Sequence, residues 1–274
     1  MKNALLERKI KTLRSSLIVL GSMTHKNVKR QYRDSFLGVL WTVLNPVLQA
    51  FVMAFVFGTF LGGSVGKPYP EYAGPEVVFV VYILAGQTVF GLMLGATRAA
   101  LPSIVRGRGL IDKVALPMSV LPISENLTSL VNFGFAFVAL VVIQLSYMGV
   151  MYTTAFALLL FLPSLIIFSL GISLVLASIF VFFRDIDHIY SVVASLWMYL
   201  TPLFYSVTQM KDDVAKIIKL NPMYHYVDTF RYLMVYGEYP VSWKIPLCYA
   251  MGLVSLALGV LIFNLTKKKF VLYI

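Results

Sequence analysis

The chain has 274 residues, of which 59% are hydrophobic and only 13% charged, and its mean hydropathy is +0.83. Soluble domains average about 25% charged residues, so this composition excludes an ordinary soluble protein and indicates a polytopic membrane protein. The net charge of +11 does not indicate a nucleic-acid partner, because the basic residues flank apolar runs and form no continuous stripe. One cysteine excludes an intramolecular disulfide, and three scattered histidines offer no metal-ligand cluster.

Residues 1–34 combine nine Lys or Arg with only two acidic residues. Apolar side chains recur at three- and four-residue spacing in this segment, at Ile10, Leu13, Leu17 and Leu20. The pattern predicts a basic amphipathic helix that lies in the lipid headgroup layer and is attracted to anionic lipid.

Six apolar runs follow, and each is interpreted as a transmembrane helix. They are Phe36–Leu61, Val77–Thr97, Met118–Tyr147, Thr153–Phe183, Ile189–Tyr205 and Ile245–Leu265. With both termini in the cytoplasm, 17 of the 23 Lys and Arg residues lie on the inside, as the positive-inside rule requires. The sequence therefore predicts an all-α, multi-pass membrane protein with both termini in the cytoplasm and one membrane domain over residues 1–274.

Two polar segments interrupt this pattern. Residues 98–117 are basic and contain a short apolar-polar alternation, which predicts a brief helix on the inner membrane face. Residues 206–244 mix charged residues with several tyrosines. Aromatic rings are favoured at membrane interfaces, so this second segment is predicted to form short helices that dip into the outer interface.

Four short motifs resemble the membrane subunit of ABC-2 type polysaccharide exporters, and they occur in the family's order over nearly the whole chain. They are Tyr32-Arg33-Asp34-Ser35-Phe36-Leu37-Gly38-Val39-Leu40-Trp41 with Asn45-Pro46, Leu110-Ile111-Asp112-Lys113 with Leu116-Pro117, Phe183-Arg184-Asp185, and Asn221-Pro222 followed by Phe230-Arg231. The resemblance implies a homodimer in the bacterial cytoplasmic membrane, each copy paired with a cytoplasmic ATPase, that exports O-antigen, teichoic acid or capsular polysaccharide attached to undecaprenyl diphosphate.

ATP and its magnesium ion are expected on the partner subunit, and no cofactor is expected in this chain. Its nearest approach to a phosphate-binding loop, Gly66-Lys67, is followed by Pro68 where that loop requires Ser or Thr. The chain is therefore expected to be a permease without an ATPase site of its own.

The resemblance implies that the segment Pro102–Lys113 is the coupling helix, through which force from the ATPase enters the membrane domain. Arg106, Arg108, Asp112 and Lys113 are the candidate contacts. The alternative is that these basic residues only anchor the topology, because inside loops of membrane proteins are generally basic.

Lys29, Arg30, Tyr32 and Arg33 form a cationic cluster where the amphipathic segment meets the first span. Arg offers bidentate hydrogen bonds and Lys a point charge, so the cluster is a candidate portal for the diphosphate of a lipid-linked substrate. The alternative is a charged helix end held against anionic lipid.

Aromatic residues crowd the outer half of the fifth predicted span. Trp197 and Phe204 are seven residues apart and would share one face of a continuous helix, with Tyr205 about 80° from Trp197. Sugar rings stack on aromatic rings, so Trp197, Phe204 and Tyr205 are candidates for the wall of a glycan channel. An aromatic belt at the membrane interface is the alternative.

Three other classes of membrane protein are alternatives to a polysaccharide exporter. The same topology suits an ABC-2 exporter of a small lipid or drug. An integral-membrane enzyme acting on lipid-linked sugars would need clustered carboxylates, and only Asp185 with Asp187 come near this requirement. An ion-coupled flippase would need several ionisable residues inside the membrane, where Glu125 stands nearly alone.

Overall fold

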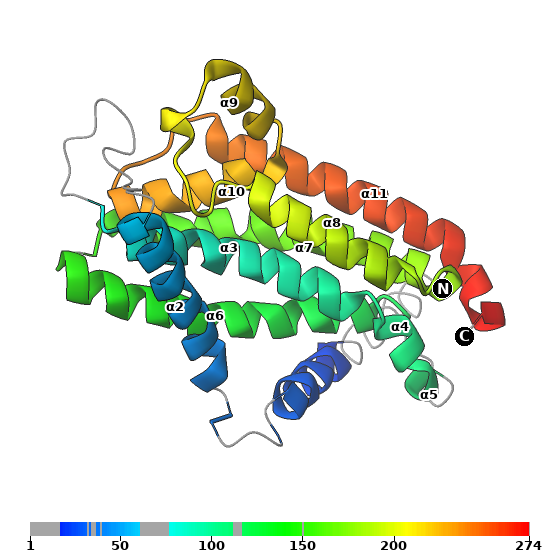
Figure 1. Ribbon diagram of the computed structural model, residues 1–274. Helices are drawn as coiled ribbons and strands as arrows, with labels where there is room; N and C mark the ends of the chain where they lie inside the picture. The colour runs from blue at the N-terminus through cyan, green and yellow to red at the C-terminus, as the bar shows by residue number, and fades with distance from the viewer. Residues whose placement is uncertain are drawn as a thin grey trace, which may run out of the picture.

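The computed structural model describes residues 17–31, 33, 37–38, 40–60, 77–111, 117–149 and 151–273. Every element within these residues is helical, which confirms the predicted all-α class. The long helices lie side by side in one bundle, as Figure 1 shows. Their bounds are α2 (Leu40–Ala54), α3 (Phe79–Ala100), α6 (Val120–Met148), α7 (Leu158–Phe182), α8 (Ile186–Leu200) and α11 (Lys244–Tyr273).

Five helical segments of the described residues are long and apolar enough to cross a bilayer. They are Leu40–Gly58, Phe79–Ala100, Val120–Met148, Thr153–Phe182 and Lys244–Phe270, and they correspond to predicted spans one to four and six. The remaining predicted span is represented by α8, whose 15 residues fall short of the roughly 20 that the hydrocarbon core requires. The predicted number of six spans is therefore not confirmed.

The centre of the bundle is α3, which packs against α2, α6, α7 and the shorter α10 (Pro222–Arg231). In the most apolar 18-residue stretch of Phe79–Ala100, 67% of the residues are buried. In the corresponding stretch of Leu40–Gly58, which begins in α2, only 6% are buried. Leu48, Val52 and Phe55 are each more than half exposed, although all three are large and apolar. The outer face of α2 is therefore left for lipid or for another chain.

Small residues allow α7 and α11 to approach closely. A Cβ atom added at Gly171 would lie 2.3 Å from the carbonyl carbon of Ser255, and one added at Gly259 would lie 2.4 Å from the carbonyl oxygen of Gly171. The Ser255 hydroxyl also donates a hydrogen bond to the carbonyl of Phe168 at 3.0 Å. Close backbone contact of this kind is the usual way in which membrane helices associate.

The polar segment 98–117 forms two short helices, α4 (Ser103–Arg106) and α5 (Arg108–Ile111). They lie at the right of Figure 1, at the same end of the bundle as the C-terminus. Residues 17–31 of the predicted amphipathic segment form a helix, while residues 1–16 lie outside the described part of the chain. The single brief helix predicted for residues 98–117 is present as the two helices α4 and α5, which are separated at Gly107.

The segment 206–244 contains α9 (Asp212–Lys219), α10 and a π-helical turn over Tyr232–Tyr236. Short helices are confirmed here, but α10 does not lie at an interface. Its side chains at positions 223, 226, 227 and 230 have no exposed surface. They recur at three- and four-residue spacing, so one apolar face of α10 packs into the bundle against α3, α7 and α11.

Candidate functional site

The junction between α8 and α10 is held by the side chain of Asn221. Its Oδ1 accepts hydrogen bonds from the backbone N–H of Met223 at 3.0 Å and from the indole N–H of Trp197 at 2.7 Å. Its Nδ2 donates to the carbonyl of Leu200 at 3.2 Å and to the hydroxyl of Thr201 at 2.9 Å. One amide therefore caps the start of α10 and the end of α8 together.

The guanidinium of Arg231 is buried at the same junction, with only 2% of the residue exposed. It donates to the carbonyl of Tyr82 from Nε at 3.2 Å and from Nη2 at 3.1 Å. Nη1 donates to the carbonyl of Pro202 at 2.7 Å, and Nη2 also donates to that of Leu203 at 3.0 Å. The cation lies 3.4 Å from the centre of the Tyr82 ring. Arg231 thus joins α10, α3 and the break after α8.

A second contact between charged side chains lies one turn of α10 before Arg231. Asp228 of α10 forms a salt bridge with Lys244 at the start of α11, and the Lys244 ammonium lies 4.2 Å from the centre of the Tyr232 ring. Burial, with the charges of Asp228 and Glu238, raises the pKa of Tyr232 to about 12. Tyr232 therefore stays neutral at physiological pH, and its ring is a cation–π partner for Lys244.

The geometry predicted for the glycan-channel candidates is wrong in one respect. Because α8 ends at Leu200, Trp197 and Phe204 do not share a helical face. Phe204 is only 5% exposed and stacks on Phe57 with ring centres 5.9 Å apart. Tyr205 is half-buried, and its hydroxyl donates to the carbonyl of Tyr199 at 2.9 Å. A channel role for Trp197, Phe204 and Tyr205 stays a prediction.

Replacing Trp197 with Phe is expected to lower the free energy of unfolding by about 1 kcal/mol, because Asn221 loses one buried hydrogen bond while the aromatic ring is kept. Unfolding in detergent measures the change. Tyr199→Phe is the matched control, since Tyr199 lies on the same helix and is 63% exposed. Equal losses in both variants would show that the bond to Asn221 contributes nothing specific.

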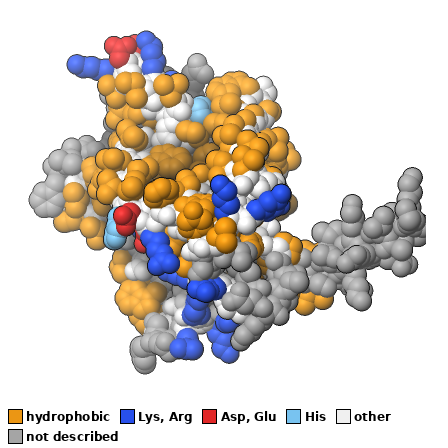
Figure 2. All heavy atoms as spheres, turned by 90° about the vertical axis from the view of Figure 1, so that its right-hand side faces the viewer, with side chains coloured by type: hydrophobic (Ala, Val, Ile, Leu, Met, Phe, Trp, Pro, Cys, Tyr) orange, Lys and Arg blue, Asp and Glu red, His pale blue; other side chains and the backbone are white. Residues whose placement is uncertain are grey.

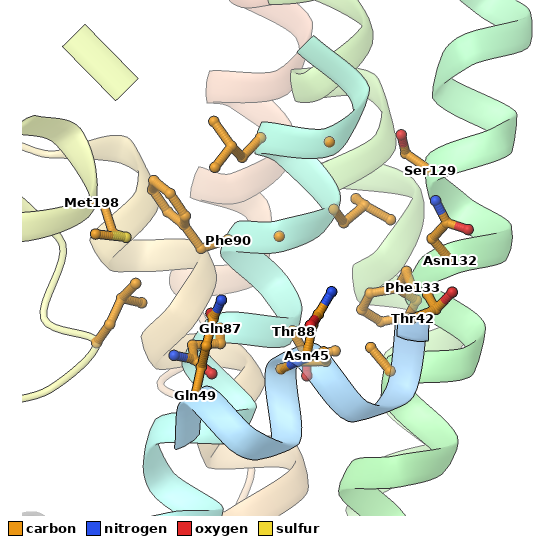
Figure 3. A pocket seen from close by; sticks show the side chains of 17 residues that line it. Thr42, Asn45, Gln49, Gln87, Thr88, Phe90, Ser129, Asn132, Phe133 and Met198 are labelled. Atoms are coloured by element: carbon orange, nitrogen blue, oxygen red, sulfur yellow. The ribbon is translucent and has the colours of Figure 1, made fainter. Parts of the chain in front are cut away.

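A cavity of about 270 Å³ lies between α2, α3 and α6, and its mostly apolar lining contains several amide and hydroxyl side chains. In Figure 3, Asn45 and Gln49 of α2 lie beside Gln87 and Thr88 of α3, whereas Thr42 lies beside Phe133 on the side of α6 that also carries Ser129 and Asn132. On each of the three helices, the lining residues are spaced at i, i+3 and i+7, so they share one face of that helix. They are residues 42, 45 and 49 of α2, residues 88, 91 and 95 of α3, and residues 129, 132 and 136 of α6.

This cavity contains hydrogen-bonding groups at membrane depth. The Oε1 atom of Gln87 is buried and has no hydrogen-bond partner within the described structure. Pro46 lies inside α2 and cannot donate the helical hydrogen bond to the carbonyl of Thr42. Amide and hydroxyl groups in an apolar span are costly unless they serve a ligand or each other. The amide and hydroxyl side chains therefore give an otherwise apolar cavity a few hydrogen-bonding positions.

The coupling and portal candidates lie at the opposite end of the bundle from the α8–α10 junction. Arg106 and Arg108 are exposed on α4 and α5, and Lys29, Arg30 and Arg33 are also exposed. Asp112, Lys113 and Tyr32 lie outside the described residues. Figure 2 shows Lys and Arg side chains gathered on the lower part of this end of the molecule. Arg30 and Arg106 line one cavity, so the structure brings together one residue from each predicted set.

Asn221 and Arg231 belong to the sequence motifs, but the sequence predicted no role for either residue. Among the amides of the cavity, only Asn45 belongs to a motif. A usable signal was present for the amides, because Gln49, Gln87 and Asn132 are polar residues inside apolar runs. No comparable signal exists for the partners of Arg231, which are backbone carbonyls.

These features define a multi-pass helical membrane protein whose bundle contains a mostly apolar cavity with several amide and hydroxyl side chains in its lining. The family model for the ABC-2 type transporter matches residues 19–235, and the chain belongs to this family. The predicted family is thereby confirmed.

The chain is also similar to two curated proteins named O-antigen export system permease protein RfbA. It is 27% identical to the one from Myxococcus xanthus, over 92% of this chain and 94% of that protein. It is 26% identical to one from Klebsiella pneumoniae, over 92% and 93%. The capsule polysaccharide export inner-membrane protein CtrC of Neisseria meningitidis is 23% identical, over 88% of each chain.

Proposed function

We propose that the chain is the permease subunit of an ATP-driven exporter, which moves polysaccharide linked to undecaprenyl diphosphate across the bacterial cytoplasmic membrane. The main support for this proposal is that the chain belongs to the ABC-2 family and is similar, over nearly its full length, to permeases named for O-antigen and capsule export. The amide and hydroxyl side chains in the cavity between α2, α3 and α6 support the proposal, since a glycan needs hydrogen-bonding groups at membrane depth.

In this proposal a separate cytoplasmic ATPase binds ATP and magnesium, and the permease hydrolyses nothing. Both termini lie in the cytoplasm, and two copies of the chain form the pathway. The exposed apolar face of α2 supports a second copy, because it is the least buried of the candidate spans. Residues 98–117 act as the coupling segment, and 206–244 contribute to the outer gate.

The proposal is tested with the chain and its partner ATPase expressed in a strain that lacks both genes. Surface glycan is expected only when both are present. Arg108→Glu should reduce export at least about tenfold while ATP hydrolysis continues, because reversed charge weakens a contact that must differ between nucleotide states. Lys269→Glu, at an exposed position near the C-terminus, is the matched control.

Surface glycan is measured with antibody, and protein level is measured in parallel by immunoblot. Export by the permease in the absence of any ATPase would reject the proposed mechanism. Full export by Arg108→Glu would reject the coupling role of this residue.

A further inference from the structure

A second cavity, of about 370 Å³, lies at the end of the bundle that carries α4 and α5. It is a partly open cavity bordered by the helix over residues 17–31, by α4 and α5, and by the first turns of α6. Its volume is in the range of small-molecule sites. The charged side chains in its lining are Lys26, Arg30, Arg106 and Glu125. The cavity therefore brings three cations and one carboxylate to a single space.

These charges are not paired with one another. Within the described part of the chain, no Lys or Arg nitrogen lies within 4.0 Å of the Glu125 carboxylate. Arg30 and Arg106 are nevertheless near enough for their charges to act on Glu125. Three cations held close together repel one another, and one carboxylate at a distance compensates for this only in part. The four charged side chains therefore line one cavity without forming ion pairs with each other.

Two further polar groups in the lining lack partners. The hydroxyl of Ser103 is buried without a hydrogen bond, in a residue that is only 5% exposed. The Nδ2 atom of Asn27 is also buried and unpartnered among the described residues. Buried polar atoms in native proteins are generally satisfied by protein groups, water or a ligand, so these two atoms offer hydrogen bonds to whatever polar molecule occupies the cavity.

The position of the cavity corresponds to the headgroup layer. α6 has 29 residues and therefore rises about 43 Å, which exceeds the hydrocarbon core of about 30 Å and matches a bilayer with its headgroups. Glu125 is in the second turn of α6, so it lies near the polar boundary. The helix over residues 17–31 is basic, as expected for a helix at this depth.

We propose that this cavity binds the headgroup of a membrane lipid that carries a phosphate and a primary ammonium, the phosphoethanolamine class. The phosphate accepts hydrogen bonds from Arg30, Arg106 and Lys26, which suit its geometry and charge. The ammonium donates to Glu125. A purely anionic headgroup would leave Glu125 facing a negative charge, and a trimethylated amine has no N–H to donate.

Such a lipid bridges parts of the chain that are otherwise separate. Its phosphate contacts the helix over residues 17–31 through Lys26 and Arg30, and α4 through Arg106. Its ammonium contacts α6 through Glu125. The bound headgroup therefore fixes the N-terminal helix to the segment proposed for ATPase coupling.

The experiment uses the full chain in detergent and native mass spectrometry, with phosphatidylethanolamine, phosphatidylcholine, phosphatidylglycerol and undecaprenyl diphosphate titrated separately. Phosphatidylethanolamine is expected to bind about tenfold more tightly than phosphatidylcholine or phosphatidylglycerol, because only it completes both charge-assisted contacts. Glu125→Gln should abolish this preference. The double variant Arg30→Gln with Arg106→Gln should weaken binding of all the phospholipids.

Lys269→Gln is the matched control, since Lys269 is exposed outside this cavity, and its preference should equal that of the unmodified chain. The comparison of lipids on the unmodified chain requires no variant, so a folding defect cannot hide the result. Equal binding of phosphatidylglycerol and phosphatidylethanolamine would overturn the proposal. So would tighter binding of undecaprenyl diphosphate that depends on Arg30 and Arg106, because the cavity would then be a diphosphate site. The measurement is independent of glycan export.

Discussion

Replacing Arg231 with Gln is expected to lower the free energy of unfolding by about 2–4 kcal/mol, as measured by thermal or denaturant unfolding in detergent. The change removes four hydrogen bonds to three carbonyls, those of Tyr82, Pro202 and Leu203. These acceptors are too deep for water to replace the lost donors. Arg231→Lys should recover only part of the loss, because one ammonium cannot reach the acceptors that the planar guanidinium joins.

A matched pair of glycines on α3 tests the same contact from the other side. A Cβ atom at Gly86 would lie 2.6 Å from Nη2 of Arg231, whereas one at Gly91 meets nothing within 4 Å. Gly86→Ala should therefore be destabilising and Gly91→Ala close to neutral. Wild-type stability of both Arg231→Gln and Gly86→Ala would show that the guanidinium does not hold the junction together.

Enlarging Gly171 is expected to separate α7 from α11, with a graded loss of stability from Ala to Val to Leu. Two of the three nearest atoms that a new side chain would meet are the backbone carbonyl carbon and oxygen of Ser255, which cannot rotate away. Gly171→Ala should cost about 1–3 kcal/mol, and Gly171→Leu should prevent accumulation of folded protein. Folded protein is measured by the monodisperse fraction in size-exclusion chromatography.

The same series at Gly134 is the control. Gly134 lies within α6, is exposed, and has nothing within 4 Å of an added Cβ atom. Ala, Val and Leu at position 134 should leave the folded fraction nearly unchanged. A similar decline in both series would mean that the losses arise from insertion into the membrane and not from the contact between α7 and α11.

The long spans could be predicted because their signal is composition over about twenty residues, which depends little on tertiary contacts. The same criterion overestimated the length of the fifth helix, because the predicted span ends at Tyr205 and α8 ends at Leu200. Pro202 disfavours a helical conformation at Thr201, and Thr201 is indeed extended with ψ at 129°. That local signal was present in the sequence, and it accounts for both the short α8 and the incorrect helical face of Phe204.

The site was less predictable because its geometry depends on contacts between distant residues. Hydropathy places α10 in a polar outer segment, yet its apolar side chains Met223, Tyr226 and Phe230 pack in the core. The partners of Arg231 are backbone carbonyls that become available only where helices break. Arg30 and Arg106 are 76 positions apart in sequence, and only the folded chain shows that they share a cavity.

The brevity of α8 has a consequence for the membrane around the protein. Its 15 residues rise about 22 Å, and its outward side chains Ile189, Val192 and Leu196 are each more than half exposed. An apolar strip of this height is about 8 Å shorter than the hydrocarbon core, so the mismatch must be absorbed by lipid wherever the strip meets it. Acyl chains beside α8 are then expected to tilt or compress, and the two headgroup layers approach each other there. A polar headgroup crossing at this side of the protein would have a shorter apolar distance to travel than in the unperturbed bilayer.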